Sequence, residues 1–281
     1  MATNSLDSVL AQYEQASKGG STSSMSQEDR MKKYFAAILK DNEKQGQKRL
    51  RILPTKDGSS PFKEVWFHEV QVDGKWVKLY DPGKNDNERS PLSEVYEELM
   101  STGKDSDKEL AKQYKPRKFY IVKVIDRDNE KDGVKFWRFK HNYKNEGILD
   151  KIIPIFRAKG DVTDSDKGRD IILEMAKAKT PKGATYTVIQ TIMYDDPCPV
   201  HSDKDTMKSW VEDELTWEDV YSKKPVEYLE AIARGETPRW DSEKGGYVYG
   251  NSDSSEESFG GKSQKYSDPQ ANQDPDDDMP F

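Results

Sequence analysis

The chain has 281 residues, of which 35% are charged and only 33% are apolar, and its formal net charge is −7. Such a polar composition predicts that part of the chain does not pack into a core. The charge is uneven: residues 251–281 hold eight acids and two lysines, so the other 250 residues are close to neutral. The negative total therefore does not exclude a partner that is itself an anion.

The predicted elements begin with residues 5–16, whose apolar spacing is typical of a short amphipathic helix. Residues 17–29 are rich in glycine and serine and favour a flexible linker. Beyond them, alternation and β-propensity predict strands, with Asp73-Gly74 as a hairpin turn between the second and third. The expected strands are 48–53, 65–72, 75–80, 118–125, 134–140, 171–175 and 185–192. The expected helices are 91–102, 106–114, 148–156, 205–215 and 225–233.

These elements predict a mainly β, α+β protein, and a partly open barrel of the OB type with inserted helices fits them best. An unrelated α+β domain with an antiparallel sheet is the alternative. We expect three parts: an N-terminal helix and linker (1–29), a core (30–240) and a disordered acidic tail (241–281). No apolar run is long enough to span a membrane, and residues 1–10 lack a secretory pattern. With one cysteine, Cys198, the sequence favours a cytoplasmic protein.

Cations and aromatic rings alternate along several predicted strands, which is the combination that holds single-stranded nucleic acid. On the strand at 118–125, Phe119 and Ile121 share a face with Lys123, and Tyr120 shares the other with Lys118. Neither face is purely apolar, so alternation does not separate core rings from binding rings. The candidate DNA contacts are Arg49, Arg51, Trp66, Trp76, Lys78, Lys115, Arg117, Lys118, Tyr120, Trp137, Arg138, Lys140, Tyr143 and Lys144.

The last six residues form a second candidate site. An acidic run followed by an apolar end offers charge for steering and one anchor for a pocket on a partner protein. We expect Asp276, Asp277, Asp278, Met279, Pro280 and Phe281 to recruit other proteins. A solubilising acidic tail is the plainer interpretation.

Metal and catalytic motifs are weak. Cys198 and His201 make half of a zinc pattern, and no second pair stands at a useful spacing. The acidic run 126–130 falls in a predicted hairpin loop, where a solvated turn is the simpler interpretation than a magnesium site. We therefore expect neither an enzyme nor a cofactor.

The order of several segments resembles the single-stranded DNA-binding proteins of T-even and related tailed phages. The segments are 46–54, Pro61-Phe62, 74–76, 118–126, 133–139 and the helix from Ile148. The resemblance implies an OB-fold that coats single-stranded DNA without sequence preference in replication, recombination and repair. It would place the protein in the host cell cytoplasm and give residues 5–15 a role in self-association. As DNA contacts it implies Arg51, Arg138, Lys115, Arg117, Lys118 and Tyr120.

The chain also departs from that family. The family's zinc site has no counterpart here, because residues 81–105 contain no cysteine or histidine, and the N-terminal arm lacks basic residues. The tip at 276–281 is similar instead to the acidic tail of bacterial single-stranded DNA-binding proteins. Three other functions stay open: a protein-only recombination or replication mediator scaffold, a single-stranded RNA-binding protein and a magnesium-dependent nuclease.

Overall fold

A computed structural model describes residues 27–72, 74–180, 183, 185–221, 223–241 and 246–249. They fold into two compact units. The first unit contains Phe67–Pro116 and the described part of 218–249, and the second contains Gln27–Trp66 and Arg117–Trp217. The range expected to form one core, 30–240, is thus shared between two units. The expected N-terminal helix at 5–16 and the acidic tip lie outside the described residues.

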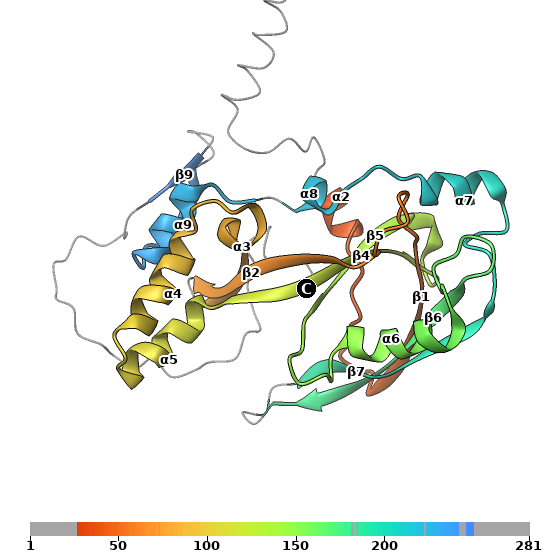
Figure 1. Cartoon of the computed structure of the whole chain (residues 1–281), viewed down its shortest axis with the longest axis horizontal. Helices are drawn as coiled ribbons and strands as arrows, with labels where there is room; N and C mark the ends of the chain where they lie inside the picture. Colours follow the sequence, from red (N-terminus) through yellow and green to blue (C-terminus); the bar gives the residue numbers. More distant parts are fainter. Residues whose placement is uncertain are drawn as a thin grey trace, which may run out of the picture. The chain divides into compact units, whose positions relative to one another are not determined.

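One seven-stranded sheet has the order β3-β2-β4-β1-β6-β7, with β5 paired to β4 (Figure 1). The pairs β1–β4, β1–β6, β2–β3, β4–β5 and β6–β7 are antiparallel. The sheet is mostly antiparallel and largely open, which confirms the expected α+β class but does not confirm the expected partly open barrel of the OB type. The strands are β1 (Gln45–Ile52), β2 (Lys63–Val72), β3 (Lys75–Tyr80), β4 (Pro116–Asp126), β5 (Val134–Lys140), β6 (Arg169–Lys179) and β7 (Thr185–Pro197).

The expected helices are present with shifted ends. Pro91 occupies the first turn of α4, where its missing N–H costs nothing. The helix α6 continues past Pro154 to Lys159 and ends at Gly160, whose φ is +76°. The helices are α2 (Gln27–Lys32), α3 (Pro82–Asp86), α4 (Pro91–Ser101), α5 (Asp105–Tyr114), α6 (Ile148–Lys159), α7 (Lys204–Val211), α8 (Trp217–Val220) and α9 (Val226–Ala233), with a 3-10 turn at Glu130–Asp132.

The sequence analysis missed α2, α3, α8 and a small two-stranded sheet of β8 (Arg239–Asp241) and β9 (Gly246–Val248). These elements have three to six residues, too few to show a hydrophobic period. No helix in the described part of the chain is long and apolar enough to cross a membrane.

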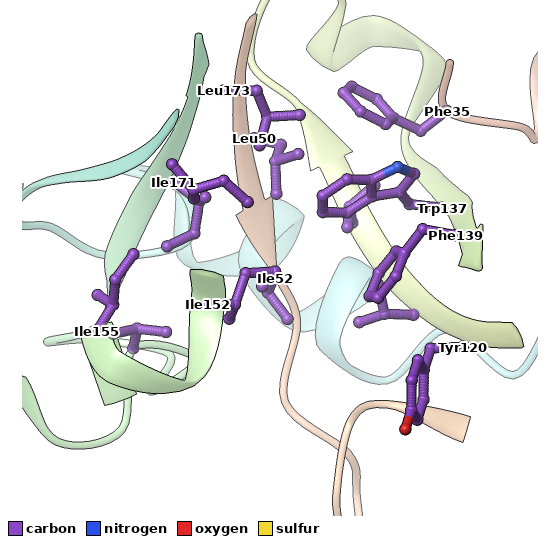
Figure 2. Packing of buried hydrophobic residues seen from close by; sticks show 14 of the residues in the cluster. Phe35, Leu50, Ile52, Tyr120, Trp137, Phe139, Ile152, Ile155, Ile171 and Leu173 are labelled. Carbon is purple, nitrogen blue, oxygen red and sulfur yellow. The ribbon is translucent and has the colours of Figure 1, made fainter. Parts of the chain in front are cut away.

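The main core of the second unit lies between α6 and the strands β1, β4, β5 and β6 (Figure 2). Leu50, Ile52 and Ile171 are fully buried there. A smaller cluster of Leu53, Ile125, Val134 and Val200 covers the opposite face of β4 and β5. Both faces of these two strands are therefore buried along most of their length, which explains why their sequences are apolar without a clean alternation.

The first unit has its own core, in which strands β2 and β3 pack with α4 and α9. It consists of Val70, Val77, Leu79, Leu92, Tyr228, Leu229 and Ile232. Helix α4 also contacts α5 and α9.

Candidate nucleic-acid interface

A series of six aromatic rings runs from the core of the second unit to its surface. Successive ring centroids are 5.7, 4.8, 5.8, 5.7 and 4.3 Å apart. Figure 2 shows the first four rings along one side of the core, with the Tyr120 hydroxyl at the end of the row. We call this series the ring ladder; its members are Phe35, Trp137, Phe139, Tyr120, His141 and Tyr143.

Exposure changes sharply along the ring ladder. Phe35, at the inner end, is 1% exposed, whereas Tyr143, at the outer end, is 69% exposed. Tyr143 is the most exposed large apolar side chain among the described residues. A ring that is open to solvent and fixed from behind by other rings suits stacking on an unpaired base.

The loop between β5 and α6 holds Tyr143 in place by local hydrogen bonds. The backbone N–H of Lys144 donates to the Asn142 side chain at 2.7 Å, and that of Gly147 donates to Asp150 at 2.9 Å. A side chain at Gly147 would lie 2.9 Å from Cβ of Asn142, so this close approach requires glycine. His141 is fixed by its backbone N–H, which donates to the Lys118 carbonyl at 2.9 Å.

Tyr120 connects the exposed end of the ring ladder to the core. Its hydroxyl oxygen lies 3.2 Å from Nδ1 of His141, within hydrogen-bond distance. Burial of the Tyr120 ring raises the pKa of its hydroxyl, so the group stays neutral at physiological pH. Tyr120 therefore supports His141 and Tyr143 from within.

Lysines lie near this exposed end. Lys144, next to Tyr143 in the chain, is exposed, whereas the ammonium of the exposed Lys140 lies 5.8 Å from the ring centroid of Phe119, on the other face of β4. The ammonium of Lys118 lies 3.0 Å from both carboxylate oxygens of Glu64 and 5.6 Å from the ring centroid of Trp66. The hydrogen bond with Glu64 raises the pKa of Lys118. Lys118 is thus charged but already paired, and a phosphate would have to compete with Glu64 for it.

Several expected DNA contacts lie in the interior instead. Tyr120, Trp137 and Arg138 are at most 7% exposed. The Arg138 guanidinium lies 5.3 Å from the ring centroid of Phe119. Their burial assigns these three residues to the core of the second unit, because both faces of β4 and β5 are covered.

Arg51 is fully buried and has internal partners, so we assign it to the core as well. Its guanidinium donates to the backbone carbonyls of Asp164 at 2.8 Å and Cys198 at 2.9 Å, and lies 3.3 Å from the Asp170 carboxylate. Strand alternation alone placed Arg51 on the same face as the exposed Arg49, which pairs with Asp195 at 3.0 Å. Alternation within β1 does not report that the segment 161–168 covers one end of that face.

The remaining expected contacts are at least partly accessible. Arg117 and Trp66 of the second unit are half-buried. In the first unit, Trp76 and Lys78 are half-buried on β3, and Lys115 is exposed.

The sequence analysis missed a second basic and aromatic cluster on the second unit. The ring of Tyr194 is 39% exposed; the Lys159 ammonium lies 4.9 Å from its centroid, and the Arg169 guanidinium carbon lies 5.5 Å away. These residues come from α6, β6 and β7, which are far apart in sequence. The only signal available was that Arg169 and Tyr194 flank two strands expected to pair.

Cys198 and His201, the two residues of the half zinc pattern, contact other side chains in the structure. Sγ of Cys198 lies 3.4 Å from the Arg51 guanidinium, and the imidazole of His201 packs edge-on against Trp210. Among the described residues, no group of three or more His, Cys, Asp or Glu side chains is placed to hold a metal ion.

Comparison with known proteins adds no family assignment: no protein-family model and no curated protein matches the chain.

Proposed function

We propose that this protein coats single-stranded DNA without sequence specificity and without an enzymatic activity of its own, in DNA replication, recombination and repair. The observation that carries the proposal is Tyr143, an exposed ring at the outer end of the ring ladder with lysines beside it. Stacking one base on such a ring contributes about 1–3 kcal/mol, and cations along the phosphates add a salt-dependent term.

Two features of the sequence support the same proposal. One is the resemblance to phage single-stranded DNA-binding proteins, which several segments share in the same order along the chain. Those proteins have an OB-type barrel, and we propose that the sheet of this protein belongs to that type. The other is the acidic tip 276–281, which we propose as the recruiting segment for replication and recombination proteins. Self-association along DNA through residues 5–16 belongs to the same proposal.

The direct test is a titration with oligo-dT at low and high salt, with duplex DNA and oligo-rU in parallel, followed by tryptophan fluorescence and by the anisotropy of labelled DNA. We expect strong binding of oligo-dT, weak binding of duplex and loss of binding as salt rises. The oligo-rU titration determines the preference between DNA and RNA.

Variants of Tyr143 connect that binding to the site. Tyr143→Leu removes the aromatic face and should weaken oligo-dT binding about 5- to 150-fold, whereas Tyr143→Phe should keep it. Tyr186→Leu is the matched control, because Tyr186 is an exposed ring on β7 of the same unit. Equal affinities for the Tyr143→Leu variant and the unmodified protein would overturn the assignment of the site. Absence of any oligo-dT binding would overturn the function.

A further inference from the structure

Trp240, on β8 of the first unit, is a large aromatic side chain that is mostly exposed to solvent. Its exposed fraction is 60%, and among large apolar side chains of the described residues only Tyr143 is more exposed. Tryptophan carries a large apolar surface that folding normally covers at least in part. An exposed tryptophan that other rings hold in place offers a flat aromatic face on which an unpaired base can stack.

A series of rings fixes Trp240 to the core of the first unit. Trp240 lies opposite Tyr247 in the register of β8 and β9, and their rings meet edge-to-face at 5.2 Å. Tyr247 in turn meets Tyr228 edge-to-face at 4.8 Å, and Tyr228 is a member of the buried cluster. The arrangement repeats that of the ring ladder, from a buried ring through a half-buried one to an exposed one.

Cations accompany these rings as well. The Lys224 ammonium donates to the Tyr247 hydroxyl at 2.8 Å and lies 5.3 Å from the centroid of that ring. It also lies 5.6 Å from the centroid of Tyr228. Arg239, next to Trp240 in β8, is exposed but lies on the other face of the two-stranded sheet, because side chains alternate along a strand. Lys224 is therefore the cation that accompanies these rings, and a cation beside aromatic rings is the combination that binds a base together with its phosphate.

We propose that Trp240 is a second base-stacking site for single-stranded nucleic acid, on the first unit, with Lys224 as the cation beside its rings. This inference rests on the proposed function and adds a site that the sequence analysis did not contain. Each unit then contributes an exposed ring that is fixed from behind by rings of its own core.

The test uses the full-length protein and a labelled oligo-dT of about 30 nucleotides, longer than the ~4–16 nucleotides that one OB-type domain covers. Trp240→Leu keeps an apolar side chain but removes the aromatic face, and it should lower the affinity about 5- to 150-fold. It should also reduce the tryptophan quenching on binding, because Trp240 no longer contributes. Trp240→Phe is the matched control: it should lose the same quenching and keep most of the affinity.

Lys224→Gln gives a second measurement that does not depend on fluorescence. Removing one phosphate contact should reduce the slope of log affinity against log salt by about one unit. An unchanged slope would remove Lys224 from the site. Thermal unfolding of the Trp240 variants should match the unmodified protein, because that side chain is exposed.

The outcomes separate this inference from the function on which it rests. If the unmodified protein binds oligo-dT and Tyr143→Leu weakens binding while Trp240→Leu does not, the Trp240 site is wrong and the function stands. If Trp240→Phe binds as weakly as Trp240→Leu, the ring does not act by stacking, and the proposal also fails. If the unmodified protein does not bind oligo-dT, both proposals fail together.

Discussion

The imidazole of His141 meets the ring of Tyr143 edge-to-face, with centroids 4.3 Å apart and ring planes at 90°. This contact is the last step of the ring ladder and the one that orients its exposed end. We predict that His141→Ala weakens oligo-dT binding by about 2- to 10-fold, the equivalent of one aromatic pair, because Tyr143 loses its support. His141→Phe should restore binding. If the His141→Ala and His141→Phe variants bind oligo-dT with equal affinity in an anisotropy titration, the contact does not orient Tyr143 for binding.

Glu64 pairs with Lys118, so a phosphate would have to displace it to reach that ammonium. Its carboxylate holds the Lys118 ammonium at 3.0 Å through both oxygens. We predict that Glu64→Gln tightens oligo-dT binding several-fold and steepens its salt dependence by up to about one unit of slope, because Lys118 becomes available to a phosphate. The control is Glu174→Gln, which makes the same charge change on β6, where Glu174 accepts from Gln47. If both variants bind equally well, the gain comes from total charge and not from Lys118.

Arg49 and Arg51 stand two residues apart on β1 and should respond differently to the same substitution. Arg51→Met leaves the buried carbonyls of Asp164 and Cys198 without their donor, at a cost of about 3 kcal/mol in the free energy of unfolding. Arg49→Met breaks only an exposed ion pair with Asp195, which is worth about 1 kcal/mol or less. Urea unfolding measures both. Equal midpoints for the two variants would contradict the structural role of Arg51.

The acidic tip should act on partners rather than on the fold. We predict that deleting residues 276–281 leaves oligo-dT binding unchanged or tighter, since a polyanion that competes with DNA is removed. The same deletion should abolish binding of replication proteins in a pull-down with purified candidates, and Phe281→Ala should reproduce that loss because it removes the apolar anchor. Markedly weaker DNA binding by the truncated protein would contradict this prediction.

The sequence predicted most of the longer elements, because their signals are local. The Asp73-Gly74 turn signal located the hairpin of β2 and β3, and Pro91 marked the start of α4. The expected strand 134–140 has the same bounds as β5. Propensity and turn chemistry depend on neighbouring residues, so a single sequence carries them.

The burial of individual site residues could not be predicted in the same way. Tyr120 and Tyr143 have similar neighbours in sequence, namely lysines and aromatic rings, yet one is 7% exposed and the other 69%. What separates them is that Tyr120 lies in a strand covered on both faces, whereas Tyr143 lies in a loop. The coverage of Tyr120 comes from residues distant in the chain, such as Phe35 and Ile152 of the same core cluster, and alternation within β4 does not report it.

Asp81 begins α3 in the interior of the first unit and links several elements. Its carboxylate accepts from the backbone N–H of Gly83 at 2.9 Å and from the Ser93 hydroxyl at 3.3 Å. The buried His68 lies beside it, with Nε2 3.6 Å from the carboxylate. Nδ1 of His68 is 2.7 Å from the Tyr114 carbonyl, which can only accept, so Nδ1 carries a proton.

This environment should make the first unit sensitive to acid. Burial by itself would raise the pKa of Asp81, but the nearby polar groups of His68 and Ser90 and the hydrogen bond from the Gly83 amide outweigh it and hold the pKa below its ordinary value of 3.8. A carboxylate whose pKa is lower in the folded state stabilises the fold fully above its unfolded pKa, and this contribution is lost as pH falls through the folded value. We predict that the first unit loses stability below about pH 4.

Asp81→Asn tests this directly. The variant should melt at a lower temperature than the unmodified protein at pH 7, and the difference should shrink as the pH falls below about 4, because the stability that the ionised carboxylate contributes is lost there. Amide hydrogen exchange should place the loss of protection in α3 and α4. Asp128→Asn is the control, because it removes an exposed carboxylate from the second unit. A melting difference between the Asp81→Asn variant and the unmodified protein that stays constant from pH 7 to pH 3 would contradict the linkage.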